Sequence, residues 1–258
     1  TLSFGAGSCD LWVLKLRPDG AVEWQKTYGG VRGDWTYSTR QTSDGGYIAA
    51  GGTDSFGTGK IALWVLKLRP DGTVEWQKTY GGVGRSDAYS IQQTSDGGYI
   101  VAGSTKPFGA GKDNLWVLKL KPNGAVEWQK TYWGAYALGV ATYAIRQTSN
   151  GGYVVAGTTE SFGAGDIDLW VLKLKSDGAV EWQKTYGGSN YDGAYSIQQT
   201  LDGGYIVAGW TDSFGAGGLD FWVLKLRPDG SFGHAQGRSI DTSCDFINDT
   251  STSGINSN

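Results

Sequence analysis

The chain repeats a short pattern of hydrophobic and polar positions at nearly constant spacing. In LWVLKL (63–68), Trp64, Leu66 and Leu68 alternate with Leu63, Val65 and Lys67. Both alternating sets are largely apolar, which is typical of a strand in a sheet that is covered on both sides. The tryptophan of this pattern recurs at intervals of 52, 52, 54 and 52 residues. An internal repeat of about 52 residues therefore organises the chain.

Each repeat predicts four short strands. Examples of the four segments are YSIQQT (89–94), the strand 99–102 that follows the SDGG turn, LWVLKL (63–68) and VEWQKTY (74–80). Asp-Gly and Pro-Asp-Gly sequences lie between them and are turn formers, because proline presets φ and glycine accepts positive φ. No period of 3.6 residues predicts a helix. A four-stranded, two-sided unit repeated about every 50 residues is typical of a β-propeller blade.

The blade count depends on how the ring closes. The LWVLKL-type strand occurs five times and the other three segments four times each. We predict an all-β fold, a single propeller of about five four-stranded antiparallel blades. Four blades with an extra strand remain the alternative. The propeller is expected to span residues 1–240, and residues 241–258 form a polar C-terminal tail that is partly used for ring closure.

The segment DLWVLKLKSDGAVEWQKTYGGSNYDGAYSIQQTLDGGYIVAGWTDSF (168–214) resembles the bacterial and archaeal repeat family named after seven-bladed β-propellers. The order and spacing of its motifs are similar to that family from residue 1 to about residue 230, with a looser kelch-like rhythm. The resemblance implies a propeller in an exported or cell-surface protein. It implies no catalytic residues, because the repeated pattern belongs to the scaffold.

Composition narrows the function classes. The chain has 43 glycines, 12 tryptophans and 14 tyrosines among 258 residues, so many turns accompany many packed aromatic faces. A net charge of −3 argues against nucleic acid as a partner. No apolar run is long enough to predict membrane insertion. The sequence contains no methionine, which favours a processed, exported protein at the cell surface or outside the cell.

Recognisable catalytic and metal motifs are missing from the sequence. The one histidine, His234, has no spaced partners that would predict a metal site or a nucleophile, so we expect no metal and no cofactor. The glutamates of VEWQ, such as Glu75, repeat in equivalent positions and are expected to line a solvated blade edge. Asp168 and its equivalents are expected to cap a loop, with calcium binding by Asp166 and Asp168 as the alternative.

Residues that break the repeat are the best candidates for a ligand site. Aromatic residues beside charged ones suit stacking on a sugar ring and hydrogen bonding to its hydroxyl groups. The alternative is that these aromatic side chains fill gaps between blades. The predicted ligand-binding residues are Asp34, Trp35, Arg85, Asp87, Trp133, Tyr136, Asp192 and Trp210.

The leading functional hypothesis is a non-enzymatic, exported binding or adhesion module whose partner is a glycan or another cell-surface ligand. Several equivalent weak sites would raise its avidity. A glycan-active hydrolase or lyase at the channel mouth is one alternative, and it would need an asymmetric set of acidic residues. A structural or protein-interaction domain is the other.

The two cysteines lie outside the repeat, one near each end of the chain. We predict a disulfide between Cys9 and Cys244 that fastens the two ends of the ring. On the chain-entropy model such a long closed loop stabilises the fold by about 5 kcal/mol. The bond requires an oxidising compartment, in agreement with export.

Overall fold

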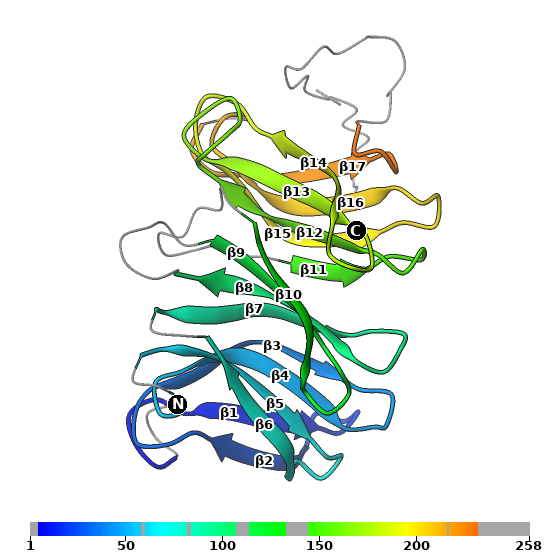
Figure 1. Ribbon diagram of the computed structural model, residues 1–258. Coiled ribbons are helices and arrows are strands. Elements are labelled where there is room, and N and C mark those ends of the chain that lie inside the picture. Colours follow the sequence, from blue (N-terminus) through cyan, green and yellow to red (C-terminus); the bar gives the residue numbers. More distant parts are fainter. Residues whose placement is uncertain are drawn as a thin grey trace, which may run out of the picture.

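The computed structural model describes residues 5–57, 60–81, 84–106, 114–132, 144–215 and 217–231. These ranges contain seventeen β-strands and no helix (Figure 1). The all-β prediction is therefore confirmed. No helix in the same ranges is long and apolar enough to cross a membrane.

The strands form five antiparallel sheets that follow one another along the chain. The first sheet is a hairpin of β1 (Leu11–Leu16) and β2 (Val22–Tyr28). Three four-stranded sheets follow: β3 (Asp34–Gln41), β4 (Tyr47–Thr53), β5 (Ala62–Leu68) and β6 (Val74–Tyr80); β7 (Ser86–Gln93), β8 (Tyr99–Thr105), β9 (Asn114–Leu120) and β10 (Val126–Tyr132); β11 (Ala144–Gln147), β12 (Tyr153–Thr159), β13 (Asp168–Leu174) and β14 (Val180–Tyr186). The last sheet has β15 (Asp192–Gln199), β16 (Tyr205–Thr211) and β17 (Asp220–Leu226).

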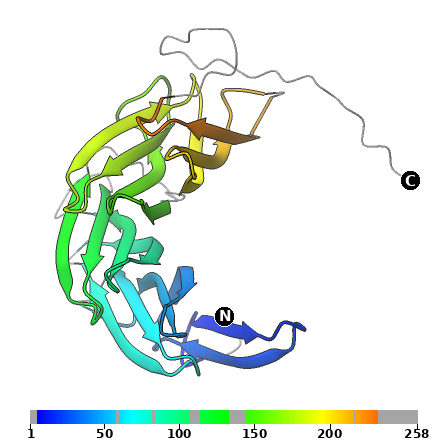
Figure 2. The ribbon, with the colours of Figure 1, turned by 90° about the vertical axis from the view of Figure 1, so that its right-hand side faces the viewer.

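The sheets are stacked as propeller blades along a curved path. Figure 2 shows an arc in which the first strand of each blade (β3, β7, β11 and β15) lies on the concave side and the fourth strand on the convex side. The four-stranded antiparallel blade is confirmed three times, and a partial blade lies at each end of the arc. The predicted closure through the tail involves residues 232–258, which lie outside the described residues.

The glycine pair of each DGGY motif turns the chain between the first and second strands. Gly45 has a φ of +80°, a left-handed conformation that favours glycine. Gly46 is needed for another reason. A Cβ atom on Gly46 would lie 2.3 Å from the carbonyl oxygen of Leu68 and 2.6 Å from the ammonium group of Lys67. The motif is therefore a structural part of the blade, as the repeat predicted.

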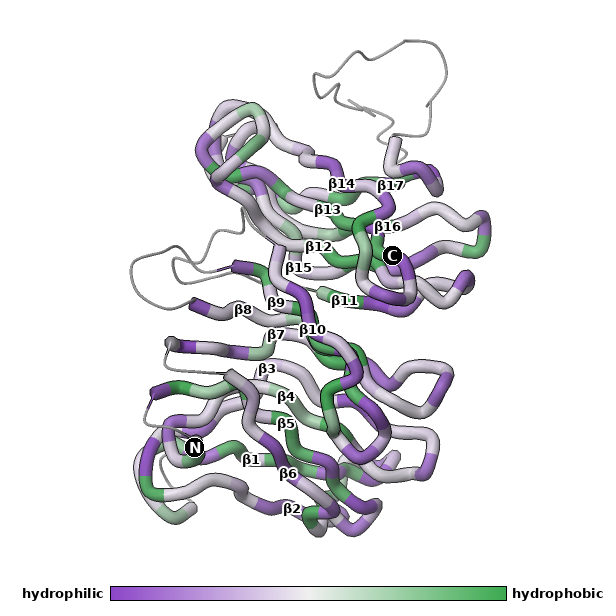
Figure 3. Tube along the Cα trace, in the orientation of Figure 1, coloured by the Kyte–Doolittle hydropathy of each residue, from purple (hydrophilic) through white to green (hydrophobic). Residues whose placement is uncertain are grey.

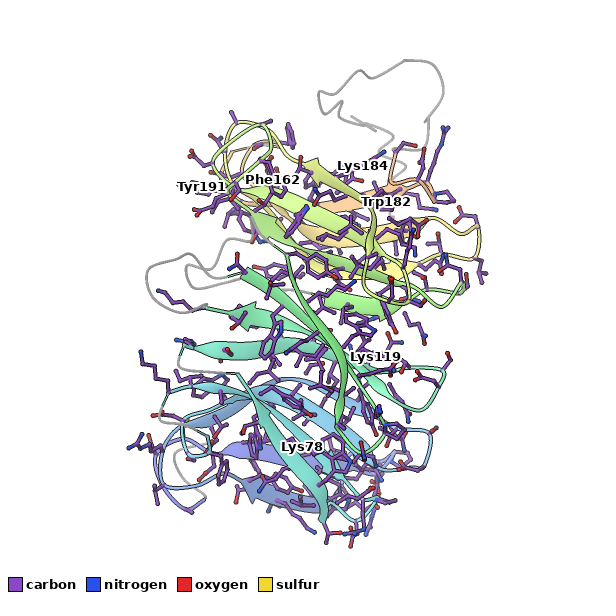
Figure 4. All side chains as sticks on the ribbon, in the orientation of Figure 1. Lys78, Lys119, Phe162, Trp182, Lys184 and Tyr191 are labelled. Atoms are coloured by element: carbon purple, nitrogen blue, oxygen red, sulfur yellow. The ribbon has the colours of Figure 1, made fainter. Side chains whose placement is uncertain are left out.

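The lysine beneath this turn ties the blade together. Lys67 is 2% exposed, and its ammonium group lies 2.8 Å from Asp44 of the turn and 3.3 Å from Glu75 on β6. It also donates a hydrogen bond to the carbonyl oxygen of Leu68. Glu75 is exposed on the outer strand, as expected, and it also neutralises the buried ammonium group of Lys67. Lys119, labelled in Figure 4, makes the same pair of contacts in the next blade.

Adjacent blades pack face to face through apolar side chains. Ile48, Ala50, Leu63 and Val65 of one blade contact a set of apolar residues on the next, and the same arrangement recurs along the arc. Figure 3 shows hydrophobic segments along the strand interiors and polar segments at many of the turns. The core is therefore a series of interfaces between blades.

Hydrogen bonds at the convex side reinforce each interface. The hydroxyl group of Tyr80 on β6 donates to the carbonyl oxygen of Gly124, in the Pro-Asn-Gly turn of the following blade, at 2.6 Å. Tyr28 makes the equivalent bond to Gly72, and burial raises the pKa of Tyr28 to about 12. The outer strand of one blade thus holds the turn of the next.

We predict that the buried lysine contributes strongly to stability. Lys67→Ala should lower the free energy of unfolding by about 2–4 kcal/mol, because it leaves two carboxylates without their cation and removes a buried stem. Urea denaturation followed by tryptophan fluorescence measures the loss. Lys225→Ala is the matched control. Lys225 occupies the same repeat position but is 45% exposed, so we expect a loss below about 1 kcal/mol. Equal losses would contradict this explanation.

Candidate functional site

Strand pairing divides the predicted acidic residues into two groups. Asp34 pairs with Thr53, and Asp192 pairs with Thr211, so these two aspartates occupy the same repeat position. In β7 that position belongs to Ser86, which pairs with Thr105. Asp87 is therefore one residue further along, in the position that Trp35 and Gly193 occupy in other blades.

Asp34 and Asp192 hold loops in place. Asp34 is buried and accepts hydrogen bonds from the backbone N–H of Gly30 at 2.8 Å and from the hydroxyl groups of Ser55, at 2.6 Å, and Thr53. Asp192 makes the corresponding three contacts in its own blade. Because these carboxylates are buried and fully engaged, their geometry matches a structural role.

The two predicted tryptophans in the described ranges fill space opposite glycine. Trp35 lies across the strand pair from Gly52, and Trp210 lies across from Gly193. A Cβ atom on either glycine would lie within 2.8 Å of the indole ring. In one blade the tryptophan lies on the first strand and in the other blade on the second strand, and in both it fills the space over a glycine of the paired strand. Both rings stay half-buried, in agreement with the alternative that the aromatic residues fill gaps.

Asp87 lies at the centre of a polar cluster. Its Oδ1 accepts a hydrogen bond from the indole Nε1 of Trp35 at 3.0 Å, and its Oδ2 lies 2.7 Å from the Nε of Arg85. Three residues that the sequence predicted are thereby brought together from two blades. Asp87 is completely buried, whereas the Arg85 side chain is 55% exposed. Asp87 therefore fixes the position of a guanidinium group that remains accessible.

Two tyrosines complete this site. The hydrogen-bonded ladder skips Tyr37 in β3 and Tyr89 in β7, so each residue is the extra one of a β-bulge. A bulge redirects a side chain out of the regular strand pattern. The centroids of the two rings lie 5.3 Å apart. We define the inner-strand cluster as Trp35, Tyr37, Arg85, Asp87 and Tyr89.

Tyr37 and Tyr89 were not predicted as site residues, for a specific reason. Each of the four sequence copies of this segment begins with a tyrosine (YSTRQT, YSIQQT, YAIRQT and YSIQQT), which made it look like part of the scaffold. Tyr195 is the corresponding bulge residue of the last sheet and is 52% exposed. The signal that distinguishes Tyr37 and Tyr89 is their neighbourhood, because only their pair of described blades provides the Arg85–Asp87 ion pair.

The charges of the cluster act on the phenol groups in opposite directions. Burial raises the pKa of Tyr37, the negative charge of Asp87 raises it further, and Arg85 opposes the change. Burial is also the main cause of the raised pKa of Tyr89. Both groups are therefore protonated phenols at neutral pH, next to a cation that favours the phenolate.

Two further arginines lie on the inner strands. Arg40 on β3 is exposed, and Arg146 on β11 donates hydrogen bonds to the carbonyl oxygen of Ile145 and the hydroxyl oxygen of Ser90. Burial lowers the pKa of Arg146, and the positive charge of Arg40 adds to this effect. Like charges that repel one another on a concave surface make it suited to an anion.

A hollow lies on the convex side. Its volume is about 300 Å³, and it is lined by Phe162, Trp170, Gln183, Lys184 and Thr185. Figure 4 labels Phe162, which comes from the loop before β13, and Lys184 on β14. The contact between its lining residues Phe162 and Trp170 recurs in other blades, for example between Phe56 and Trp64. This repetition identifies the hollow with the scaffold.

The remaining predicted residues have different outcomes. Trp133, Tyr136 and Cys244 lie outside the described residues, whereas Cys9 is described and is exposed. Asp168 is buried under its loop and accepts a hydrogen bond from the backbone N–H of Gly165. Burial raises its pKa. Among the described residues, no three His, Cys, Asp or Glu side chains gather as ligands for a metal ion.

Comparisons with known proteins support the propeller fold. A family model described as a domain of unknown function (DUF5122) beta-propeller matches residues 201–232. This short match does not extend to the seven-bladed or kelch-like family that the sequence resembled. The search of curated proteins found no match.

Two solved structures from Bacteroides species are similar to this fold. An endo-arabinase from Bacteroides thetaiotaomicron VPI-5482 has a TM-score of 0.49 and 12% identity, over 82% of this chain and 84% of that chain. A bifunctional GH43-CE from Bacteroides eggerthii has a TM-score of 0.44 and 20% identity, over 81% of this chain and 26% of that one. At such low identity the likeness concerns the fold alone.

These findings correct the leading functional hypothesis. The sequence favoured a non-enzymatic binding or adhesion module, whereas the similar solved structures are an endo-arabinase and a bifunctional GH43-CE. We therefore withdraw the non-enzymatic interpretation. The glycan-active alternative has to be judged on the residues of this chain.

The cluster predicts opposite effects of its two charges on the tyrosines. Arg85→Ala should raise the pKa of Tyr37, because it removes the cation that favours the phenolate. Asp87→Asn should lower the pKa of Tyr37, because it removes a repelling negative charge. Titration of ¹³C-labelled tyrosine by NMR measures both shifts. Arg32→Ala removes a cation of the loop before β3 that pairs with Asp54, outside the cluster, and should leave the titration unchanged. Shifts of the same sign in both cluster variants would contradict the assigned geometry.

Proposed function

We propose that the chain is a glycan-active propeller that cleaves an acidic polysaccharide on its concave side. The observation that carries the proposal is the inner-strand cluster, in which two bulge tyrosines lie beside an accessible arginine. Its position on the inner strands places these groups where a chain-like substrate can lie across several blades (Figure 2). Aromatic rings next to charged groups suit a sugar ring.

The substrate class follows from the charges. Arg85 uses its Nε in the hydrogen bond to Asp87, and a guanidinium group has five N–H donors. Donors therefore remain for a carboxylate, which arginine binds in a paired geometry. Arg40 and Arg146 add positive charge to the same side. A polysaccharide containing uronic acids meets these requirements.

The groups present favour an elimination. Arg85 pairs with the carboxylate of the uronic acid and makes the proton on the adjacent carbon more acidic. The phenolate of Tyr37, the more exposed tyrosine, takes this proton. A carbon–carbon double bond forms as the carbon–oxygen bond to the neighbouring sugar breaks, and the phenol of Tyr89 donates its proton to the departing oxygen. Proton exchange with water then restores both tyrosines.

Hydrolysis is the other reaction in the glycan-active class. In most glycoside hydrolases it uses two carboxyl groups that flank the bond that breaks. Asp34, Asp87 and Asp192 are the acidic residues of the described inner strands, and all three are buried in hydrogen bonds. The geometry of the described residues therefore favours the lyase over the hydrolase. Both reactions produce new reducing ends, and only elimination produces an unsaturated sugar.

Activity assays test this proposal. The purified chain is incubated with polygalacturonate and alginate, with neutral arabinan as the comparison. We expect an ultraviolet-absorbing unsaturated product from a polyuronide. Tyr89→Phe should lower kcat by about 10²–10⁴-fold, because it removes the proton donor. The rate should rise on the alkaline side of neutrality, since the raised pKa of Tyr37 keeps the base protonated at lower pH.

Tyr195→Phe provides the matched control. Tyr195 occupies the same bulge position, but it belongs to a different blade from the cluster. Its loss should leave kcat nearly unchanged. Reducing ends without the unsaturated product would favour the hydrolase and remove the role given to Tyr89. No product from any of the three polysaccharides would contradict the proposed function.

Export and the disulfide remain predictions. Cys9 lies just before β1 in an exposed position, which is compatible with a bond to Cys244. Intact mass spectrometry after alkylation, with and without reductant, measures the number of reactive thiols. We expect none in the native protein and two after reduction. Two alkylated thiols in the native protein would contradict the disulfide and weaken the case for an oxidising compartment.

A further inference from the structure

Both ends of the arc expose apolar side chains that are buried in every complete blade. At the N-terminal end, Leu14 and Leu16 of β1 are 41% and 51% exposed. Their equivalents in β5, Leu66 and Leu68, are 1% and 0% exposed. The pattern of β1 is the same as in β5, so the difference comes from the absence of a preceding blade among the described residues. We call the Leu14 and Leu16 side of β1 the N-terminal face.

The C-terminal end shows the opposite side of a blade. Phe221 and Val223 of β17 are 79% and 48% exposed, whereas the equivalent Leu169 and Val171 of β13 are fully buried. Trp222, Leu224 and Leu226, on the other side of the same sheet, do pack on the preceding blade. We call the Phe221 and Val223 side of the last sheet the C-terminal face.

The two faces are the two halves of an interface that the chain already contains. Between complete blades, Leu115 and Val117 on one sheet pack against Trp170, Leu172 and Leu174 on the next. The C-terminal face has the same repeat positions as the first set. The N-terminal face has the same repeat positions as the second.

The turn at the N-terminal end also lacks a packing contact that the equivalent turns of the complete blades make. In the complete blades, the glycine of each Pro-Asp-Gly-type turn lies against a tryptophan of the preceding blade, as Gly72 lies against Trp24 and Gly124 against Trp76. A Cβ atom on Gly20, in the turn between β1 and β2, would contact nothing within 4 Å. The first hairpin therefore has the surface of a blade that receives a neighbour.

We propose that a second copy of this chain docks here, with the C-terminal face of one copy packing on the N-terminal face of the other. The argument is continuity, because the contact between copies repeats the contact between blades. Each copy carries one face of each kind, so association is head-to-tail. Such an interface either closes into a ring or continues as a filament. This inference is independent of the proposed catalytic activity.

Solution mass measurements on the full chain test the proposal. We expect concentration-dependent oligomers by size-exclusion chromatography with light scattering, both with and without reductant, so that cross-linking through cysteine is excluded as their cause. Phe221→Asp and Leu14→Asp should each give monomers, because each introduces a charge into one face. Val31→Asp is the matched control. Val31 is 77% exposed but belongs to neither face, so this variant should assemble like the unaltered chain.

Mixing the two monomeric variants provides the decisive measurement. The Phe221→Asp chain keeps an intact N-terminal face, and the Leu14→Asp chain keeps an intact C-terminal face. An equimolar mixture should therefore give a heterodimer that grows no further. Circular dichroism verifies that both variants are folded. An unaltered chain that stays monomeric at all concentrations, or a mixture that does not associate, would overturn the proposal.

Discussion

The fold depends on one constraint: each blade has two apolar faces and must cover both. Leu63 and Val65 of β5 contact the next blade, while Trp64 and Leu66 of the same strand contact the preceding hairpin. A single blade would leave one of these sets in water, so stability arises only from stacking. The polar contacts depend on the same stacking, because Lys67 is shielded from water only when both faces of its blade are covered.

This constraint determines where a functional site can form. Side chains on the two faces of a blade pack against the neighbouring blades, and the turns at one end of the blade bind the buried lysines. The inner edge of the first strand is less constrained, because it has no further strand to pair with in its own sheet. A bulge at this edge releases Tyr37 and Tyr89 from the regular ladder. The site therefore develops where the repeat leaves the backbone least restricted.

Sequence patterns predicted the blade well and the site only in part. Alternation in LWVLKL and the Asp-Gly turns identified strands and their burial, since both depend on local residue types. Trp35, Arg85 and Asp87 stood out because they break the repeat, and the structure brings them together. The contact between Tyr37 and Tyr89 was not predictable, because it depends on a bulge that shifts the strand register by one residue, and the residue pattern does not reveal this bulge.

The cluster also explains how a nearly identical repeat acquires one distinct site. A tyrosine in the same position also occurs elsewhere in the repeat, but Trp35 comes from one blade while Arg85 and Asp87 come from the next. No single blade carries the site, so its geometry is set by the packing between two blades. The indole of Trp35 fills the space above Gly52 and at the same time donates to Asp87, which in turn positions Arg85. A side chain that serves the interface thus also arranges the charges, which is why changes to blade packing and changes to chemistry are coupled at this position.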